Sequence, residues 1–266
     1  GTRPEAIKMA PVVLELGRRR HEVGSIVCVT GQHRQMLDQV LAAFAIRPDV
    51  DLDLMRPDQG LSALTAALFP ALDDLVRRER PDWVLAQGDT TTVLVASLVA
   101  FYNHVRFGHV EAGLRTGDLQ RPFPEELNRY VADRVADLLF APTEHCRRAL
   151  LREGHPNERI HVTGNTVIDA LRLILERPHS WSSGPLSDLP KDGRLVLLTA
   201  HRRESFGQPL RDLCLAIRDL AHAFPDVCFV FPVHMNPQVR QPVGEVLSEV
   251  ANVRLLDPLD YSSLFI

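Results

Sequence analysis

The sequence predicts an α/β protein in which parallel sheets are flanked by helices. Short runs of apolar, largely β-branched residues recur along the chain, and each ends in polar or glycine residues before a helical pattern begins. Uniformly apolar strands that alternate with helices are typical of a parallel sheet covered on both faces. The runs that carry this pattern are SIVCVT, DWVLAQ, RFGHV, DLLFA and RIHVT, followed in the second half by RLVLLT, VCFVFP and VRLLD.

The bulk composition is that of an ordinary globular protein, with 45% hydrophobic and 24% charged residues. A formal net charge of −4 argues against nucleic-acid binding, which normally needs a basic excess. The basic runs at 17–20 and 77–80 fit the last turns of helices. The apolar run VLVASLVAFY is too short for a membrane span, so we expect no membrane partner. The four cysteines are scattered without a C-x-x-C pair, which favours reduced thiols in a cytoplasmic enzyme.

Two domains are expected, residues 1–163 and residues 164–266. The alternation of strands and helices lapses between residues 175 and 193, where Pro, Ser and Gly are frequent, and then resumes. The chain opens on a loop and a helix start, which predicts that the first domain lacks its first strand. The second domain has three convincing strands, too few for a sheet of this type, so we expect it to be truncated and the chain to be a fragment.

The residues with chemical potential follow the predicted strands. In parallel sheets, ligands bind beyond the carboxyl ends of the strands, where helix N-termini also point. In GTRPEAIK, Pro4 suits a first helical position and Arg3 and Lys8 supply cations, so the segment predicts either an anion site or an ordinary capped helix. The GxGxxG and GKS/T patterns are absent, so NAD and ATP lack their usual signatures.

Three carboxylates are expected to converge at the carboxyl edge of the predicted sheet. They are Asp89 in GDTTT, Glu111 in FGHVEAGLRTGD and Glu125 in PEELNR. Acids repel a neighbouring pyrophosphate, so these side chains make better sense as proton-transfer groups, each of which contributes roughly 10²–10⁴-fold to a rate. Chelation of a metal is the alternative, but only His109 lies close to any of the acids and no compact metal-ligand motif is present.

The second half contributes two histidine motifs at successive strand ends, AHRRES and PVHMNP. A single histidine is more often structural, but this repetition beside arginines favours a role that faces a ligand. The residues concerned are His201, Arg202, Arg203 and His234. In GNTVID, by contrast, we expect only the cap of a helix.

Taken together, these motifs closely resemble the non-hydrolysing UDP-N-acetylglucosamine 2-epimerases of bacteria, in register along essentially the whole chain. The motifs that carry the resemblance are GTRPEAIKMAP, QHRQMLDQVL, GDTTT, GHVEAGLRTGD, PFPEELNR, GNTVIDAL, AHRRES and PVHMNP. The resemblance implies two Rossmann-like domains in a glycosyltransferase-B arrangement and a homodimer. It also implies reversible conversion of UDP-N-acetylglucosamine to UDP-N-acetylmannosamine through 2-acetamidoglucal, with no cofactor and no obligatory metal.

The resemblance also assigns roles by motif. Asp89, Glu111 and Glu125 match the acid–base carboxylates, and His201 matches a catalytic histidine that contacts the UDP phosphates. Arg3 and Lys8 match cations of the substrate loop, so that the substrate-binding set also includes Asp89, Glu111 and His201. A second UDP-N-acetylglucosamine acts as an allosteric activator in this family, and the matching positions are Gln32, Gln35, Glu126, Arg202 and His234.

The chain departs from the family pattern at its end. Family members continue past Ile266 with an S-G-G loop and paired glutamates that hold uridine, so we expect this polypeptide alone to be inactive. Two enzymatic alternatives stay open, a hydrolysing epimerase that releases free N-acetylmannosamine and a glycosyltransferase-B-type UDP-sugar transferase. A non-catalytic nucleotide-sugar sensor is the alternative from another class.

Overall fold

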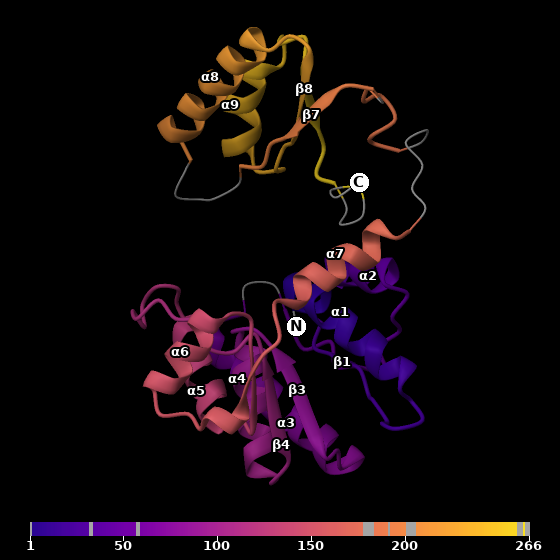
Figure 1. Cartoon of the computed structure of the whole chain (residues 1–266), viewed down its shortest axis with the longest axis vertical. Helices are drawn as coiled ribbons and strands as arrows, with labels where there is room; N and C mark the ends of the chain where they lie inside the picture. The colour runs from indigo at the N-terminus through magenta and orange to yellow at the C-terminus, as the bar shows by residue number, and fades with distance from the viewer. Residues whose placement is uncertain are drawn as a thin grey trace. The chain divides into compact units, whose positions relative to one another are not determined.

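The computed structural model divides the chain into two compact units, Gly1–Glu176 and Arg177–Ile266 (Figure 1). It describes residues 2–31, 34–56, 59–177, 184–190, 192–200, 206–259 and 263, with only the backbone for residues 34–36. Each unit contains a parallel sheet and helices of its own.

The first unit is built on a four-stranded parallel sheet with the strand order β3-β4-β5-β6. Its strands are β3 (Trp83–Gln87), β4 (Arg106–Val110), β5 (Leu138–Ala141) and β6 (Ile160–Val162). A separate pair of short parallel strands is formed by β1 (Cys28–Val29) and β2 (Val50–Asp51). Because all four strands of the larger sheet run the same way, the turns that follow them lie along one edge.

The helices of this unit follow the strands in the alternating order that a parallel sheet requires. They are α1 (Arg3–Arg18), α2 (Arg34–Ala43), α3 (Leu61–Glu79), α4 (Thr91–Tyr102), α5 (Glu125–Val135), α6 (Glu144–Arg152) and α7 (Thr166–Leu175), with a 3₁₀ turn at Asn157–Arg159. The basic runs at 17–20 and 77–80 do coincide with the ends of α1 and α3, as the sequence predicts.

Helix α4 is the central helix of the unit. It is apolar on nearly every side, as expected of a helix that is buried all round. It packs against both α3 and α5. Helix α3, by contrast, turns a single leucine-rich stripe inward, with Leu64, Leu68 and Leu72 spaced at one helical turn. The core of the unit therefore lies between the sheet and these helices, and it holds the strand ends in place.

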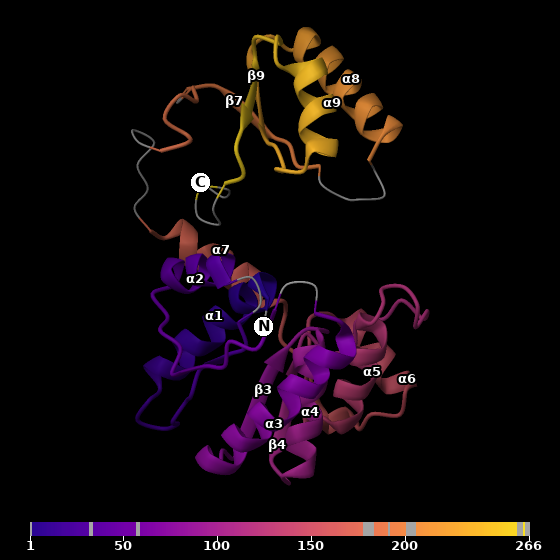
Figure 2. The same ribbon diagram turned by 180° about the vertical axis from the view of Figure 1, so that it is seen from behind.

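Helix α7 belongs to the first unit by its contacts, because it packs along α1 (Figure 2). The contacts therefore divide the chain after Glu176, beyond the end of this helix. The boundary between residues 163 and 164, which the lapse and return of the strand–helix alternation indicates, stays a prediction.

The second unit contains a three-stranded parallel sheet with the order β7-β8-β9. Its elements are β7 (Arg194–Leu197), α8 (Gln208–Ala223), β8 (Val227–Pro232), α9 (Pro237–Leu247) and β9 (Val253–Leu256). The central strand β8 is buried almost throughout, and its Phe229 and Phe231 pack with Cys214 and Val239 from the two helices. In contrast, β7 lies at an edge and is exposed along its whole length.

The predicted class is confirmed, because every strand pair in the described residues is parallel and helices follow the strands. The runs RFGHV and VCFVFP form strands over their full length, whereas only two residues of SIVCVT do. Strand β2 was not among the predicted runs. Over the part of the chain that the structure describes, no helix combines the length and apolarity needed to cross a membrane.

The turn after β4 depends on Gly113. Its φ of +83° is left-handed, and a Cβ there would lie 2.6 Å from the carbonyl oxygen of Cys146 and 2.9 Å from Leu150 Cγ. The conformation costs an L-residue about 1–2 kcal/mol and overpacking typically adds about 1–3 kcal/mol. We therefore expect Gly113→Ala to lower the free energy of unfolding by about 2–5 kcal/mol, measured by urea denaturation.

Gly117 provides the matched control for this prediction. Its φ of +79° is nearly the same, but a Cβ there would meet nothing within 4 Å. Gly117→Ala should therefore show only the conformational cost, about 1–2 kcal/mol. Equal losses at the two positions would contradict the packing argument.

Candidate active site

Segments from across the first unit meet at the carboxyl edge of its sheet. The first turns of α1 reach two strand ends, because Glu5 accepts a hydrogen bond from the Thr90 hydroxyl at 2.7 Å and Lys8 lies 2.7 Å from Glu111. The start of α7 joins them through Asn165, whose amide donates to Glu111 at 3.0 Å. Residues far apart in sequence are thus brought together where the sequence predicts a ligand site.

Glu111 directly follows β4 and is held from two sides. Lys8 Nζ lies 2.7 Å from each carboxylate oxygen, and Oε2 also accepts from Asn165. The side chain is 11% exposed. Its backbone has a φ of +71°, a left-handed conformation that costs a residue with a Cβ about 1–2 kcal/mol. Such strain clusters at functional sites, where the surrounding structure enforces it.

Asp89 follows β3, the neighbouring strand, and is oriented by α5. Arg129 donates to Asp89 Oδ2 from Nε at 3.0 Å and from a terminal nitrogen at 2.5 Å. Asn128 fixes the backbone by donating to the Asp89 carbonyl at 2.7 Å. For Oδ1 no partner occurs among the described residues, and the side chain is 28% exposed. One oxygen of Asp89 is therefore anchored while the other is available to a ligand.

Glu125 and Arg3 have no hydrogen bond or ion pair within the described ranges. Glu125 stands in the first turn of α5 and is half-buried. Arg3 stands in the first turn of α1, where backbone N–H groups and the helix dipole favour an anion. That helix start is organised by a capping box between Thr2 and Glu5, with Pro4 in its first turn. The predicted helix start is confirmed, and the helix carries the two cations Arg3 and Lys8. Anion binding at this helix start stays a prediction.

Glu126 is fully buried and supports the loop before α5. Its Oε1 accepts from the backbone N–H groups of Thr116 at 2.8 Å and Gly117 at 2.9 Å, and its Oε2 accepts from Arg129 at 2.9 Å. Burial by itself would raise the pKa of Glu126, but the hydrogen bonds from Gly117 and Thr116 and the Arg129 charge outweigh it and lower the pKa. Arg129 thus joins Asp89 to a buried second carboxylate.

Beneath these turns lies a chain of buried ionic groups that the sequence did not predict. His109 on β4 and Asp133 on α5 are both fully buried, with Nδ1 and Oδ1 2.5 Å apart. Arg115 donates to the other Asp133 oxygen at 2.7 Å and to both oxygens of Glu153 at 2.7 and 2.8 Å. The guanidinium also lies 4.3 Å from the centre of the Tyr130 ring. This set of four charged residues is called the buried ionic chain below.

The pKa values of His109 and Asp133 shift in the direction that favours their charged forms. Burial would raise the pKa of Asp133, but the charges of His109 and Arg115 outweigh it and lower the pKa. Burial would lower the pKa of His109, but the Asp133 carboxylate outweighs it and raises the pKa. The charged forms of His109 and Asp133 therefore stabilise each other.

Of the site residues predicted in the second half, His234 is the one that lies within the described residues. His201, Arg202, Gln32 and the side chain of Gln35 lie outside the described residues. His234 is exposed at the carboxyl end of β8, where its Nδ1 accepts from the backbone of Asn236 at 3.1 Å. Of the positions assigned to an activator site, Glu126 has both oxygens occupied within the protein. The allosteric assignment therefore stays a prediction.

Sequence inspection missed the groups that orient the acids, although it had signals for some of them. Glu126, Arg129 and Asp133 recur at helical spacing on α5, so they mark one polar face that turns out to be buried. The pair Thr2 and Glu5 has the capping-box spacing. Asn165 does cap α7, as expected, but its second bond to Glu111 had no sequence signal.

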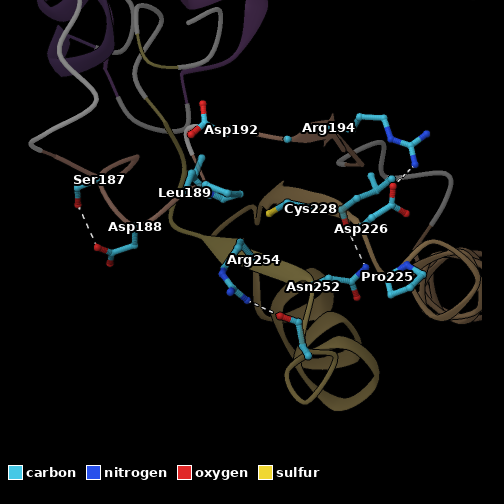
Figure 3. Close-up of a pocket in the computed structure, with 14 residues that line it drawn as sticks. Ser187, Asp188, Leu189, Asp192, Arg194, Pro225, Asp226, Cys228, Asn252 and Arg254 are labelled. Atoms are coloured by element: carbon cyan, nitrogen blue, oxygen red, sulfur yellow. Dashed lines mark hydrogen bonds and ion pairs between the residues drawn. The ribbon is translucent and has the colours of Figure 1, made fainter.

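The clearest hollow in the second unit lies elsewhere, at the amino ends of β7, β8 and β9 (Figure 3). Its two arginines have partners within the protein, because Arg194 contacts Asp226 and Arg254 donates to the Ala251 carbonyl at 2.7 Å. Ligands of parallel sheets bind at the opposite, carboxyl edge. None of the predicted site residues lines this hollow.

Metal binding has no arranged ligand set in the described ranges. No group of three or more His, Cys, Asp or Glu side chains there is placed to hold an ion. Asp89 and Glu111 are instead paired with Arg129 and Lys8.

The fold and the site define an α/β protein that presents oriented acids and cations at the carboxyl edge of a parallel sheet. Comparison with known families extends this description. A family model described as UDP-N-acetylglucosamine 2-epimerase matches residues 15–265. The chain belongs to this family, whose named members are isomerases.

Individual relatives support the assignment. The chain is 49% identical to UDP-N-acetylglucosamine 2-epimerase of Salmonella typhimurium and 48% identical to that of Escherichia coli, each time over 98% of its own length and 71% of the relative. The crystal structure of UDP-GlcNAc 2-epimerase from Neisseria meningitidis bound to UDP-GlcNAc matches with a TM-score of 0.85 and 44% identity, over 100% of this chain and 72% of that one. A glycosyltransferase from Rickettsia africae, at 12% identity and a TM-score of 0.53, shares the fold alone.

The lowered pKa of Glu126 predicts a pH-dependent contribution to stability. A depressed folded-state pKa stabilises the protein above the unfolded value, and this stability is lost as the pH falls through the folded value. Glu126→Gln should therefore lower the free energy of unfolding at neutral pH by about 1–3 kcal/mol, because buried donors lose a charged acceptor. Urea denaturation from pH 7 down to acid should show the difference shrinking.

Glu144 offers the control, since it too lies in the first turn of a helix but is exposed. Among the residues that the structure describes, it pairs only with Arg147, at 3.3 Å. Glu144→Gln should change the free energy of unfolding by about 0.5 kcal/mol or less at any pH. A deficit of Glu126→Gln that is independent of pH would contradict the electrostatic origin.

Proposed function

We propose that the protein catalyses the reversible epimerisation at C2 of UDP-N-acetylglucosamine to UDP-N-acetylmannosamine, without hydrolysis of the product. Membership of the epimerase family and the Neisseria relative bound to UDP-GlcNAc support this substrate. The observation that carries the proposal is the placement of Asp89 and Glu111 on neighbouring strand ends, each fixed by one cation.

The chemistry explains why such a site gathers acids. The C2 proton has no adjacent ketone to acidify it, so inversion needs the C1–O bond to break as the proton leaves. The proposed route eliminates UDP to give 2-acetamidoglucal, and UDP adds back after reprotonation on the opposite face. Both faces of the sugar then need a proton-transfer group, and departing UDP needs positive charge.

Asp89 and Glu125 suit proton transfer as they stand. Asp89 Oδ1 has no partner in the part of the chain that is described, and Glu125 has no ion pair there. Glu111 differs, because Lys8 and Asn165 occupy both of its oxygens. In this proposal, Lys8 moves from Glu111 towards the phosphates when the substrate binds, which releases the carboxylate for its acid–base role. Arg3 and the predicted phosphate contact His201 supply the remaining stabilisation of UDP.

Two enzymatic rivals share parts of this site. A UDP-sugar transferase would need an acceptor, and it would not need three carboxylates around a single sugar. A hydrolysing epimerase would release free N-acetylmannosamine and UDP rather than UDP-N-acetylmannosamine. The proposed partner is therefore UDP-N-acetylglucosamine, as substrate and, through the predicted second site, as activator. A homodimer is proposed from the family resemblance.

Incorporation of deuterium distinguishes these functions. The complete protein encoded by the gene, incubated with UDP-N-acetylglucosamine in deuterated water, should place deuterium at C2 without any acceptor and should form UDP-N-acetylmannosamine. We expect Asp89→Asn, Glu111→Gln and Glu125→Gln each to lower the exchange rate by roughly 10²–10⁴-fold, because each removes a proton-transfer group. Mass spectrometry and proton NMR follow the label and the product.

Glu144→Gln serves as the control for these variants, since Glu144 also opens a helix of the same unit but is exposed. Its exchange rate should equal that of the wild type. Undiminished exchange in all three acid variants would refute the proposed roles. Free N-acetylmannosamine as the first product would favour the hydrolysing enzyme.

The family resemblance also predicts that residues 1–266 alone do not turn over substrate. The same deuterium assay on that polypeptide tests this directly, with the complete protein as the positive control. Turnover at a comparable rate would contradict it.

A further inference from the structure

His109 has hydrogen-bond acceptors at both of its ring nitrogens. Nδ1 lies 2.5 Å from Asp133 Oδ1, and Nε2 lies 2.7 Å from the Gly88 carbonyl oxygen. A carbonyl has no proton to give, so Nε2 must carry one for this contact to be favourable. The ring therefore donates towards Gly88 whatever the state of Nδ1.

The state of Nδ1 follows from the surroundings of Asp133. Its second oxygen accepts from Arg115 at 2.7 Å and from the backbone N–H of Gly113 at 3.1 Å. Two donors on Oδ2, one of them a cation, hold the carboxylate in its charged form, so the proton between Oδ1 and Nδ1 belongs to the ring. Both nitrogens are then protonated, and the ring is an imidazolium.

The charged ring acts on the turn that carries Asp89. The Gly88 peptide is fixed at both ends, because its N–H donates to the Val110 carbonyl at 3.0 Å and its C=O accepts from His109. Gly88 has a φ of +88°, so the chain turns sharply here, directly before Asp89. The same Asp133 also anchors Gly113, two residues after Glu111. The buried pair of His109 and Asp133 thus connects the turn that presents Asp89 with the turn that presents Glu111.

We propose that His109 is held as a buried imidazolium and is a positioning residue for Asp89, acting through the hydrogen bond from Nε2 to the Gly88 carbonyl. This inference rests on the proposed function, since it takes Asp89 to be a proton-transfer group. His109 itself is 0% exposed, so it acts through the Gly88 carbonyl rather than by contact with a substrate.

The groups around the His109 ring favour its charged form, so the ring loses its charge only as the pH rises. The charged groups that act on it are Asp133 from α5 and Arg115 from the loop after β4. The flanking strands contribute the apolar Ala86 and Leu139, and the Phe107 ring lies 6.1 Å away. The Asp133 charge outweighs burial and raises the pKa of His109.

The sign of the effect follows from that direction. An unfolded histidine has a pKa of about 6.5, so the stabilisation by the charged ring is complete below that pH. It declines as the pH rises through the raised folded-state value. The catalytic rate should fall over the same alkaline interval, because the neutral ring can satisfy only one of its two acceptors.

Two variants of the complete protein separate positioning from bulk packing. His109→Gln places an amide N–H near the position of Nε2, so it retains a donor for Gly88, whereas His109→Asn is too short to reach it. We expect kcat for C2 exchange to fall in the order wild type, Gln, Asn, with the Asn variant down by about 100-fold, since small misplacements of a catalytic group cost about that much. KM should change less than about threefold. His161→Gln, at an exposed histidine on β6, should leave kcat unchanged.

The charge itself is tested by ¹⁵N NMR of the histidine rings of the unmodified protein. The signal of His109, assigned by its absence from the His109→Gln spectrum or by selective labelling where that variant does not fold, should show two protonated nitrogens at pH 7.5. The alkaline limb of the kcat profile should follow the loss of that state and should be absent from His109→Gln. A neutral ring at pH 7.5, or equal kcat values for the Gln and Asn variants, would overturn the proposal.

The outcomes for Asp89 separate the two hypotheses. If Asp89→Asn leaves exchange undiminished, the proposed function of that residue fails while the imidazolium can still be observed by NMR. If Asp89→Asn abolishes exchange but the His109 variants exchange normally, only the positioning role fails.

Discussion

The buried ionic chain from the Gly88 carbonyl through His109, Asp133 and Arg115 to Glu153 is the interaction on which the arrangement of the site depends. Charges removed from water carry a desolvation cost of several kcal/mol each unless they are paired and hydrogen-bonded. Here positive and negative groups alternate, so each charge is compensated by its neighbours. Deleting Asp133 would leave His109 without its anionic partner and Arg115 with Glu153 alone, which makes the arrangement selective for one geometry.

The buried ionic chain also explains how the turns after β3 and β4 hold Asp89 and Glu111 in defined positions. The turns after β3 and β4 contain glycine and a strained Glu111, and they would otherwise sample several conformations. Asp133 and His109 fix them from below, while Arg129 and Lys8 fix their carboxylates from the side. The proposed acid–base role needs such preorganisation, because a substrate must meet proton-transfer groups that are already in position.

The orientation of Asp89 and Glu111 connects the site to the helices as well. Arg129 on α5 spans Asp89 and the fully buried Glu126, which in turn holds the backbone at Thr116 and Gly117. A change in that loop would therefore reach Asp89 through a single side chain. The predicted activator position Glu126 thus lies in direct contact with the arginine that orients the proposed proton-transfer group.

The sequence by itself determined the parallel α/β class, most strands and the edge at which the acids gather, because these depend on local apolar periodicity and on the shared direction of the strands. Family resemblance added the roles of these residues and the activator positions, among them Gln32 and Gln35, by motif. Only the tertiary structure decided which groups hold them. Lys8 and Glu111, or His109 and Gly88, are separated along the chain, and their pairing depends on helix packing and strand register that no local pattern encodes. The same packing determines that one face of α5 buries its charges rather than exposing them.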